Sequence, residues 1–130
     1  MGKKHLWELE FWEDDQGNCP AADAMRALKS SNSVLFEFVC EKIRRFSEDW
    51  EIKNFLGSKY ITDLKNGLWE YKITAAKNEF RMLGIIENFA VPPQFLCFHC
   101  FHKKSKKIPL KHIKISLQRL AEYKRSKNKK

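Results

Sequence analysis

Residues that could bind a metal or form a disulfide gather near the end of a predicted strand. The segment Cys97-Phe98-His99-Cys100, followed by His102, has the Cys-x-x-Cys spacing of many zinc and redox sites. Alternating apolar and polar residues predict a strand here, so that the two cysteines point to opposite faces of a sheet. Sulfur atoms on opposite faces cannot share one ion or readily form a disulfide. We therefore expect no metal and no cofactor, and interpret both cysteines as small buried side chains.

A second set of candidate residues flanks the segment 75–78. If these four residues form an even-numbered loop between two strands, Lys72 lies directly opposite Arg81. Two facing cations destabilise a sheet unless an anion lies between them, and a phosphate is the natural candidate. The alternative is a solvated pair that Glu70, on the same face, partly neutralises in the free protein. Under the first interpretation, loss of Arg81 should abolish activity and leave the fold at least as stable as before.

The connection between the last predicted strand and the last predicted helix is strongly basic. The run His102-Lys103-Lys104-Ser105-Lys106-Lys107 precedes Pro109, and Lys111 follows in the first helical turn. Such a cluster can neutralise phosphates, and the N–H groups of a first helical turn also favour anions. An ordinary solvated lysine cluster is the alternative. Its position in the same half of the chain as Arg81 favours a functional role.

The first half of the chain, which contains none of these basic residues, is expected to form a strand and two helices. Apolar and acidic side chains alternate in residues 5–12, which is typical of a strand with one buried face. Pro20 opens a short helix that ends near residues 30–33. A longer helix follows, and its apolar stripe consists of Leu35, Val39, Ile43, Phe46 and Trp50. The two helices should pack as a hairpin.

The second half of the chain carries the candidate residues on strands. After the turn signal Asn66-Gly67, three strands are expected in series, at 68–74, 79–87 and 94–102. A last helix is expected to begin near Pro109, and its apolar face consists of Leu110, Ile113, Leu117 and Leu120. The order strand, two helices, three strands, helix indicates an α+β fold, with helices packed on one antiparallel sheet.

Charge is distributed unevenly along the chain, whose 130 residues carry a net charge of +9. Residues 1–52 hold 7 basic and 11 acidic residues, a net charge of −4, whereas residues 53–130 hold 18 and 5, a net charge of +13. A basic half indicates a polyanionic partner, because neutralising phosphates releases condensed counterions. Residues 124–130 are expected to be a frayed basic tail.

Length and composition favour one domain, residues 1–130, with a single core. No apolar run is long enough for a membrane span, and the first residues lead into charged sequence rather than a signal core. Four unevenly spaced cysteines do not resemble the framework of a secreted mini-protein. We therefore expect a cytoplasmic protein with reduced thiols and no membrane partner.

Three segments of the second half, taken together, match a known pattern. They are Leu64-Lys65-Asn66-Gly67-Leu68-Trp69-Glu70-Tyr71-Lys72-Ile73, then Asn78-Glu79-Phe80-Arg81-Met82-Leu83, then Phe98-His99-Cys100-Phe101-His102-Lys103-Lys104-Ser105-Lys106-Lys107-Ile108-Pro109. With them the chain resembles the RelE/HigB superfamily of toxin–antitoxin toxins, particularly its phage-derived HigB-like branch. The expected helix pair after the first strand also agrees with that family's fold.

The resemblance implies a ribosome-dependent endoribonuclease that needs no metal or cofactor and is held inactive by a helix-turn-helix antitoxin. Matched to the family's basic positions, Arg81 is assigned to transition-state stabilisation and Lys72 to the base or to electrostatics. His102 is a candidate acid or base, with a purely structural role as the alternative. The expected catalytic residues are Lys72, Arg81, His102 and Lys104. The residues expected to bind mRNA on the ribosome are Lys103, Lys106, Lys107 and Lys111.

The chain departs from the family after the last basic residues and also in its length, which leaves Asn88–Pro93 unexplained. Some members place a tyrosine shortly after the basic strand residues, where this chain has Ile108-Pro109-Leu110, and Tyr123 lies much later. Family members that resemble ParE inhibit DNA gyrase and lack nuclease residues, so the fold alone does not decide the activity. A gyrase inhibitor and a non-catalytic RNA-binding protein are therefore the alternatives. Lys72, Arg81 and the lysine cluster favour the nuclease.

Overall fold

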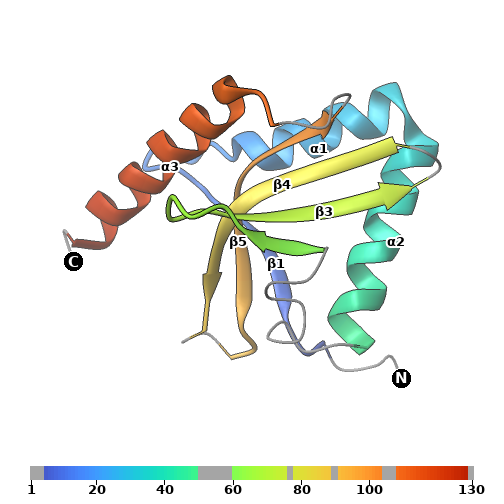
Figure 1. Cartoon of the computed structure of the whole chain (residues 1–130), viewed down its shortest axis with the longest axis horizontal. Helices are drawn as coiled ribbons and strands as arrows, with labels where there is room; N and C mark the ends of the chain where they lie inside the picture. The colour runs from blue at the N-terminus through green and yellow to red at the C-terminus, as the bar shows by residue number, and fades with distance from the viewer. Residues whose placement is uncertain (1–4, 50–59, 76–77, 89–90, 104–107, 129–130) are drawn as a thin grey trace.

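The computed structural model describes residues 5–49, 60–75, 78–88, 91–103 and 108–128 (Figure 1). These residues form strands β1 (Glu8–Phe11), β2 (Ile61–Asp63), β3 (Trp69–Ala75), β4 (Asn78–Glu87) and β5 (Gln94–Lys103), and helices α1 (Pro20–Ser31), α2 (Ser33–Asp49) and α3 (Leu110–Asn128). The helical hairpin follows the first strand and a helix comes last, which confirms the predicted α+β fold. None of the described helices is both long and apolar enough to cross a membrane.

The five strands form one sheet in the order β1-β5-β4-β3-β2. Strands β2 to β5 are an antiparallel meander in which consecutive strands are neighbours. Strand β1 pairs with β5 and runs parallel to it. The prediction of an entirely antiparallel sheet is wrong for this strand, because its direction depends on the crossover through α1 and α2 and not on its own residues. The sequence also missed β2, whose three residues are too few to show alternation.

The predicted turn at Asn66-Gly67 joins β2 to β3. Gly67 has a φ of +94°, in the left-handed region that glycine adopts most readily. The turn is closed by the backbone N–H of Leu64, which donates to the carbonyl oxygen of Leu68 at 3.0 Å. It sets the start of β3 and therefore the position of Lys72.

Helices α1 and α2 cover one face of the sheet. Trp7 and Phe95 pack against Tyr71 there, with ring centroids 5.9 and 6.0 Å from its ring. Of the predicted apolar stripe of α2, Leu35 and Val39 are buried and Ile43 and Phe46 pack against the same core. The last predicted member, Trp50, lies outside the described residues.

Helix α3 lies against the other face, on the side away from α2 (Figure 1). A second core forms beneath it from Trp12, Leu68, Phe98 and Leu120. The helix continues to Asn128, so that residues 124–128, predicted to be a frayed end, are helical. Within the sheet, the helix packs mainly on β5 and β4.

A β-bulge between β4 and β5 changes which side chains share a face. The register of the two strands shifts between Leu83 and Gly84, so that Phe98 is an extra residue on β5. A Cβ atom at Gly84 would lie 2.0 Å from the carbonyl oxygen of Leu96, so this close approach of two strands requires glycine. Beyond the bulge the side chains of β5 alternate with the opposite parity.

The bulge places Cys97 and Cys100 on the same face, contrary to the sequence prediction. Both thiols are free and buried under the helical hairpin, where they act as the small core side chains expected of them. The Cys100 thiol donates to the carbonyl oxygen of Ala21 at 3.3 Å. Burial, and after it a hydrogen bond with Cys100, raises the pKa of the Cys97 thiol. The prediction of diverging sulfur atoms is wrong because it assumed unbroken alternation along β5.

Candidate functional site

A row of three side chains crosses the sheet on the face that α3 partly covers. Lys72 on β3 pairs with Arg81 on β4, and Arg81 pairs with Phe101 on β5. Directly paired residues point to the same face, and neighbouring strands lie about 4.8 Å apart. Lys72, Arg81 and Phe101 therefore lie side by side and are termed the Lys72 row. The predicted register, with Lys72 opposite Arg81, is confirmed.

Arg81 is a paired and buried cation. Its Nη1 donates to Oε1 of Glu70 at 2.6 Å, and its Nη2 donates to Oε2 of Glu79 at 2.5 Å. The side chains of Arg81 and Glu70 are only 8% and 9% exposed, whereas that of Glu79 is 37% exposed. Of the two alternatives that the sequence left open, the one with Glu70 as counter-ion is present for Arg81, although Arg81 is buried and not solvated. The charge of Arg81 is therefore compensated without a bound anion.

Lys72 differs from Arg81 in both burial and partners. Its side chain is half-buried, and its backbone N–H donates to the carbonyl oxygen of Tyr60 at 2.7 Å. Among the residues that the structure describes, no carboxylate forms an ion pair with its ammonium group. The positive charge of Lys72 is therefore free to meet an anion at this face.

Three rings stack where the first turn of α3 meets β5. The ring of His112 lies parallel to that of Phe101, with centroids 3.8 Å apart and 4° between the planes. Nε2 of His99 lies 2.7 Å from Nδ1 of His112. The backbone of His112 is also held, because its N–H donates to Pro109 at 3.0 Å and its carbonyl oxygen accepts from the Ser116 hydroxyl at 2.8 Å. The stack extends the Lys72 row from the sheet onto the helix.

Arg119, further along α3, adds a cation behind the histidine pair. Its Nη1 donates to the carbonyl oxygen of Phe98 at 2.7 Å and lies 3.3 Å from Nδ1 of His99. Burial, together with the positive charge of Arg119 and the neighbouring His112, lowers the pKa of His99 to about 4. Burial and the charge of Lys111 lower the pKa of His112. Both imidazoles are therefore neutral at pH 7.

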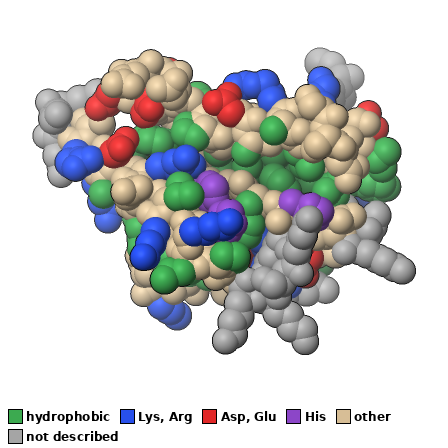
Figure 2. All heavy atoms as spheres, turned by 90° about the horizontal axis from the view of Figure 1, so that it is seen from above, with side chains coloured by type: hydrophobic (Ala, Val, Ile, Leu, Met, Phe, Trp, Pro, Cys, Tyr) green, Lys and Arg blue, Asp and Glu red, His purple; other side chains and the backbone are tan. Residues whose placement is uncertain are grey.

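The surface around this group is basic. Seen from above, histidine side chains reach the surface among lysine and arginine side chains (Figure 2). Lys111 is exposed on the first turn of α3, next to His112. Lys103 pairs with Glu79 at the end of β5, but its side chain is not among those described. Lys104, Lys106 and Lys107 lie outside the described residues.

His102 lies apart from the Lys72 row. It pairs with Phe80, so that it projects from the opposite face of the sheet to Arg81. Its side chain is exposed, and its Nε2 lies 2.9 Å from Oδ1 of Asn78. The structure therefore does not bring His102 together with Lys72, and the hydrogen bond with Asn78 favours the structural alternative for this histidine.

The histidine pair was missed by the sequence analysis. The signal that could have revealed it is Gly84, because a glycine inside an otherwise apolar strand often marks a bulge. A bulge there changes the face on which His99 lies. The contact of His99 with His112 could not be inferred in this way, because the spacing of residues in the sequence does not show where α3 packs on the sheet.

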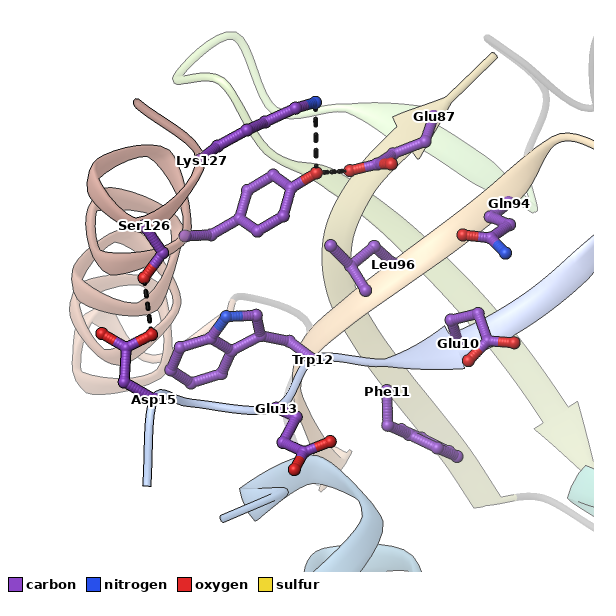
Figure 3. Close-up of a pocket in the computed structure, with 11 residues that line it drawn as sticks. Glu10, Phe11, Trp12, Glu13, Asp15, Glu87, Gln94, Leu96, Ser126 and Lys127 are labelled. Carbon is purple, nitrogen blue, oxygen red and sulfur yellow. Dashed lines mark hydrogen bonds between the residues drawn. The ribbon is translucent and has the colours of Figure 1, made fainter. Parts of the chain in front are cut away.

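A groove of about 960 Å³ lies at the other end of α3 (Figure 3). Its lining includes Trp12 and Leu96 together with four carboxylates, from Glu10, Glu13, Asp15 and Glu87. The Tyr123 hydroxyl donates to Glu87, and the Ser126 hydroxyl donates to Asp15 at 2.7 Å. Burial and the Glu87 carboxylate raise the pKa of Tyr123. This region is termed the acidic groove, and it is distinct from the Lys72 row.

Fold and site together define a small α+β protein with a cationic, histidine-bearing face. The family model described as "Phage derived protein Gp49-like (DUF891)" matches residues 23–121, which include most of α1, all of α2 and of β2 to β5, and α3 as far as residue 121. The chain belongs to this phage-derived Gp49-like family, which is consistent with toxins of toxin–antitoxin systems. No curated protein matches the chain.

Proposed function

We propose that this protein is the toxin of a toxin–antitoxin pair and cleaves mRNA on the ribosome, as its resemblance to the RelE/HigB superfamily implies. The observation that carries the proposal is the Lys72 row. In this row the half-buried side chain of Lys72, which has no ion-pair partner among the described residues, lies two strands from the ring stack, in a chain of the Gp49-like family. A fixed cation at a partly desolvated surface is what the developing charge of a phosphoryl transition state requires.

The proposed reaction is an internal transfer of the phosphoryl group. The ribose 2′-hydroxyl gives its proton to a water molecule and attacks the adjacent phosphorus, the bond to the 5′-oxygen breaks, and that oxygen takes a proton from water. The products are a 2′,3′-cyclic phosphate and a 5′-hydroxyl end. This chemistry needs cations and proton transfer but no metal or cofactor.

Lys72 is assigned to stabilising the negative charge that develops on the phosphorane. Arg81 is assigned to holding the row in place, because Glu70 and Glu79 already share its charge. His102 is left out of proton transfer, since it projects from the other face of the sheet. Lys104, which lies outside the described residues, keeps its proposed catalytic role. The residues assigned to holding the RNA are Lys103, Lys106, Lys107 and Lys111. The expected protein partner is a helix-turn-helix antitoxin.

Primer extension on mRNA, with and without ribosomes, tests the proposal. The wild-type protein should cleave only with ribosomes present, and Lys72→Ala should lower the cleavage rate on the order of a hundredfold. Lys29→Ala is the matched control, because Lys29 is exposed on α1 under the opposite face of the sheet. Both variants should melt like the wild type. Inhibition of gyrase supercoiling by a wild-type protein that leaves mRNA intact would establish the ParE-like alternative instead.

A further inference from the structure

The hydrogen bonds that join Arg119, His99 and His112 all run the same way, with Arg119 donating to His99 and His99 donating to His112. A guanidinium group only donates, so Nδ1 of His99, 3.3 Å from Nη1 of Arg119, must carry a lone pair. The single ring proton of neutral His99 is then on Nε2, which donates to Nδ1 of His112 at 2.7 Å. The ring proton of neutral His112 is therefore on its Nε2. The reverse order is excluded, because a proton on Nδ1 of His99 would point at the guanidinium.

The end of this chain of hydrogen bonds is a free donor. Within the described ranges, no hydrogen-bond partner accepts from Nε2 of His112, whose ring is half-buried. The parallel stack on Phe101 holds the plane of this ring. Phe101 lies two strands from Lys72 in the same row, a separation of about 10 Å. A rigid N–H donor and an unpaired ammonium group thus face the same side, and both favour an anionic oxygen.

We propose that His112 is an RNA-contacting residue whose Nε2–H donates to a phosphate oxygen of single-stranded RNA. His99 and Arg119 are positioning residues that fix its tautomer, and Phe101 holds its ring. This inference rests on the proposed function, and it names a residue on α3 where the sequence pointed only to strands and the basic connection. The ligand class is the phosphodiester backbone, so the contact does not depend on base identity.

An NMR titration tests the contact without cleavage. The probe is an unstructured RNA oligonucleotide with 2′-O-methyl groups, which cannot react because the attacking hydroxyl is blocked. In the free protein, the ring ¹⁵N shifts should show His99 and His112 as Nε2–H tautomers. Added oligonucleotide at low salt should shift the Nε2 and H resonances of His112 in a saturable way. In Arg119→Met, His99 should become a mixture of tautomers, a change that a merely structural role of Arg119 would not produce.

Two variants of His112 connect the contact with cleavage on ribosomes. His112→Phe keeps a ring on Phe101 and removes the donor, so cleavage should fall on the order of a hundredfold. His112→Gln restores an N–H donor and should recover part of the rate. Lys29→Ala again serves as the control, and melting shows that each variant is folded.

The outcomes separate this inference from the proposed function. Unmoved His112 resonances in a protein that binds the oligonucleotide, or full cleavage by His112→Phe, would overturn the inference alone. A wild-type protein that binds the oligonucleotide through His112 and cleaves no mRNA would overturn the nuclease and leave the RNA contact standing. Absence of binding at low salt together with absence of cleavage would overturn both.

Discussion

The two ends of α3 meet the sheet with opposite chemistry. At the first turn, His112 stacks on Phe101, which lies two strands from Lys72 in the same row. At the last turns, Tyr123 and Ser126 donate hydrogen bonds to carboxylates of the acidic groove. One helix therefore contacts the Lys72 row at its first turn and carboxylates of the acidic groove at its last turns.

The two ends differ in the partner that each buried carboxylate has. Glu70, next to the Lys72 row, is neutralised by Arg81, whereas Glu87 in the groove accepts from a neutral phenol. The charge of Glu70 is thus balanced by Arg81, whereas the phenol of Tyr123 brings no charge to balance that of Glu87. Three of the carboxylates that line the groove come from the acidic first half of the chain. Basic side chains, Arg125 and Lys127, also lie in the last turn of α3, and Lys127 lines the groove, so net charge alone does not distinguish the two ends for a polyanion.

The largest expected effect is a loss of stability in Arg81→Ala. The substitution leaves Glu70 charged, buried and without its partner, which should lower the free energy of unfolding by about 3–5 kcal/mol. Urea unfolding measures this change. The sequence predicted no loss of stability for this variant, and the two ion pairs of Arg81 reverse that expectation.

The control for Arg81→Ala is the double variant Glu70→Leu with Arg81→Met. Removing both charges should recover most of the lost stability, because no uncompensated buried charge remains. Equal losses in the single and double variants would mean that Glu70 is not the group that needs Arg81.

Gly84→Ala should have the next largest effect. Its Cβ atom would meet the carbonyl oxygen of Leu96 at 2.0 Å, so β4 and β5 must move apart. We expect a loss of about 3 kcal/mol, at the upper end of the usual range for overpacking. Thermal melting measures it. Gly17→Ala, in an exposed turn, lacks the contact between strands, but the φ of +86° at Gly17 should cost that variant about 1 kcal/mol, so it should lose less stability than Gly84→Ala. Wild-type stability in Gly84→Ala would show that the bulge does not require glycine.

Tyr123→Phe should distinguish the two ends of α3. The buried Glu87 loses its donor, so stability should fall by about 1–2 kcal/mol, while ribosome-dependent cleavage by the remaining folded protein stays unchanged. His112→Phe should show the opposite combination, with wild-type melting and little cleavage. Loss of cleavage in a fully folded Tyr123→Phe protein would mean that the acidic groove also takes part in the reaction.

The smallest expected effect is a pH dependence due to His99. Its pKa is about 4 in the folded protein against an ordinary 6.5. Between these values the unfolded chain binds a proton that the native protein does not, so this contribution, complete above pH 6.5, is lost as the pH falls towards 4. Urea unfolding at pH 7 and pH 5 should show a smaller difference in His99→Gln than in the wild type. Equal differences would mean that His99 titrates normally.

Local signals explain what the sequence predicted correctly. Pro20 begins α1, Asn66-Gly67 forms the turn before β3, and the length of the loop after β3 sets Lys72 opposite Arg81. Each of these features depends on a few neighbouring residues. The three helices and the central hairpin could therefore be located before any tertiary contact was known.

What the sequence could not show depends on contacts between distant elements. The parallel direction of β1 is set by a crossover, and the burial of the ion pair between Arg81 and Glu70 depends on the folded sheet. The extra residue Phe98 reverses the parity of β5, which brings the two cysteines together and moves His99 to the face of α3. The proposed contact of His112 with RNA depends on two such features: the bulge, which places His99, and the packing of α3, which places His112.

The pairing of β1 with β5 joins the first strand to be synthesised with the last. Trp7, completely buried beside β1, has its final surroundings only after residues 94–97 have been added to the chain. Contacts between such distant residues form slowly, because a long loop must close before they gain any free energy. Strand β1 therefore stays without its partner strand until β5 has been added to the chain. Since β5 also carries Phe101, the sheet and the platform beneath His112 are completed in the same late step of folding.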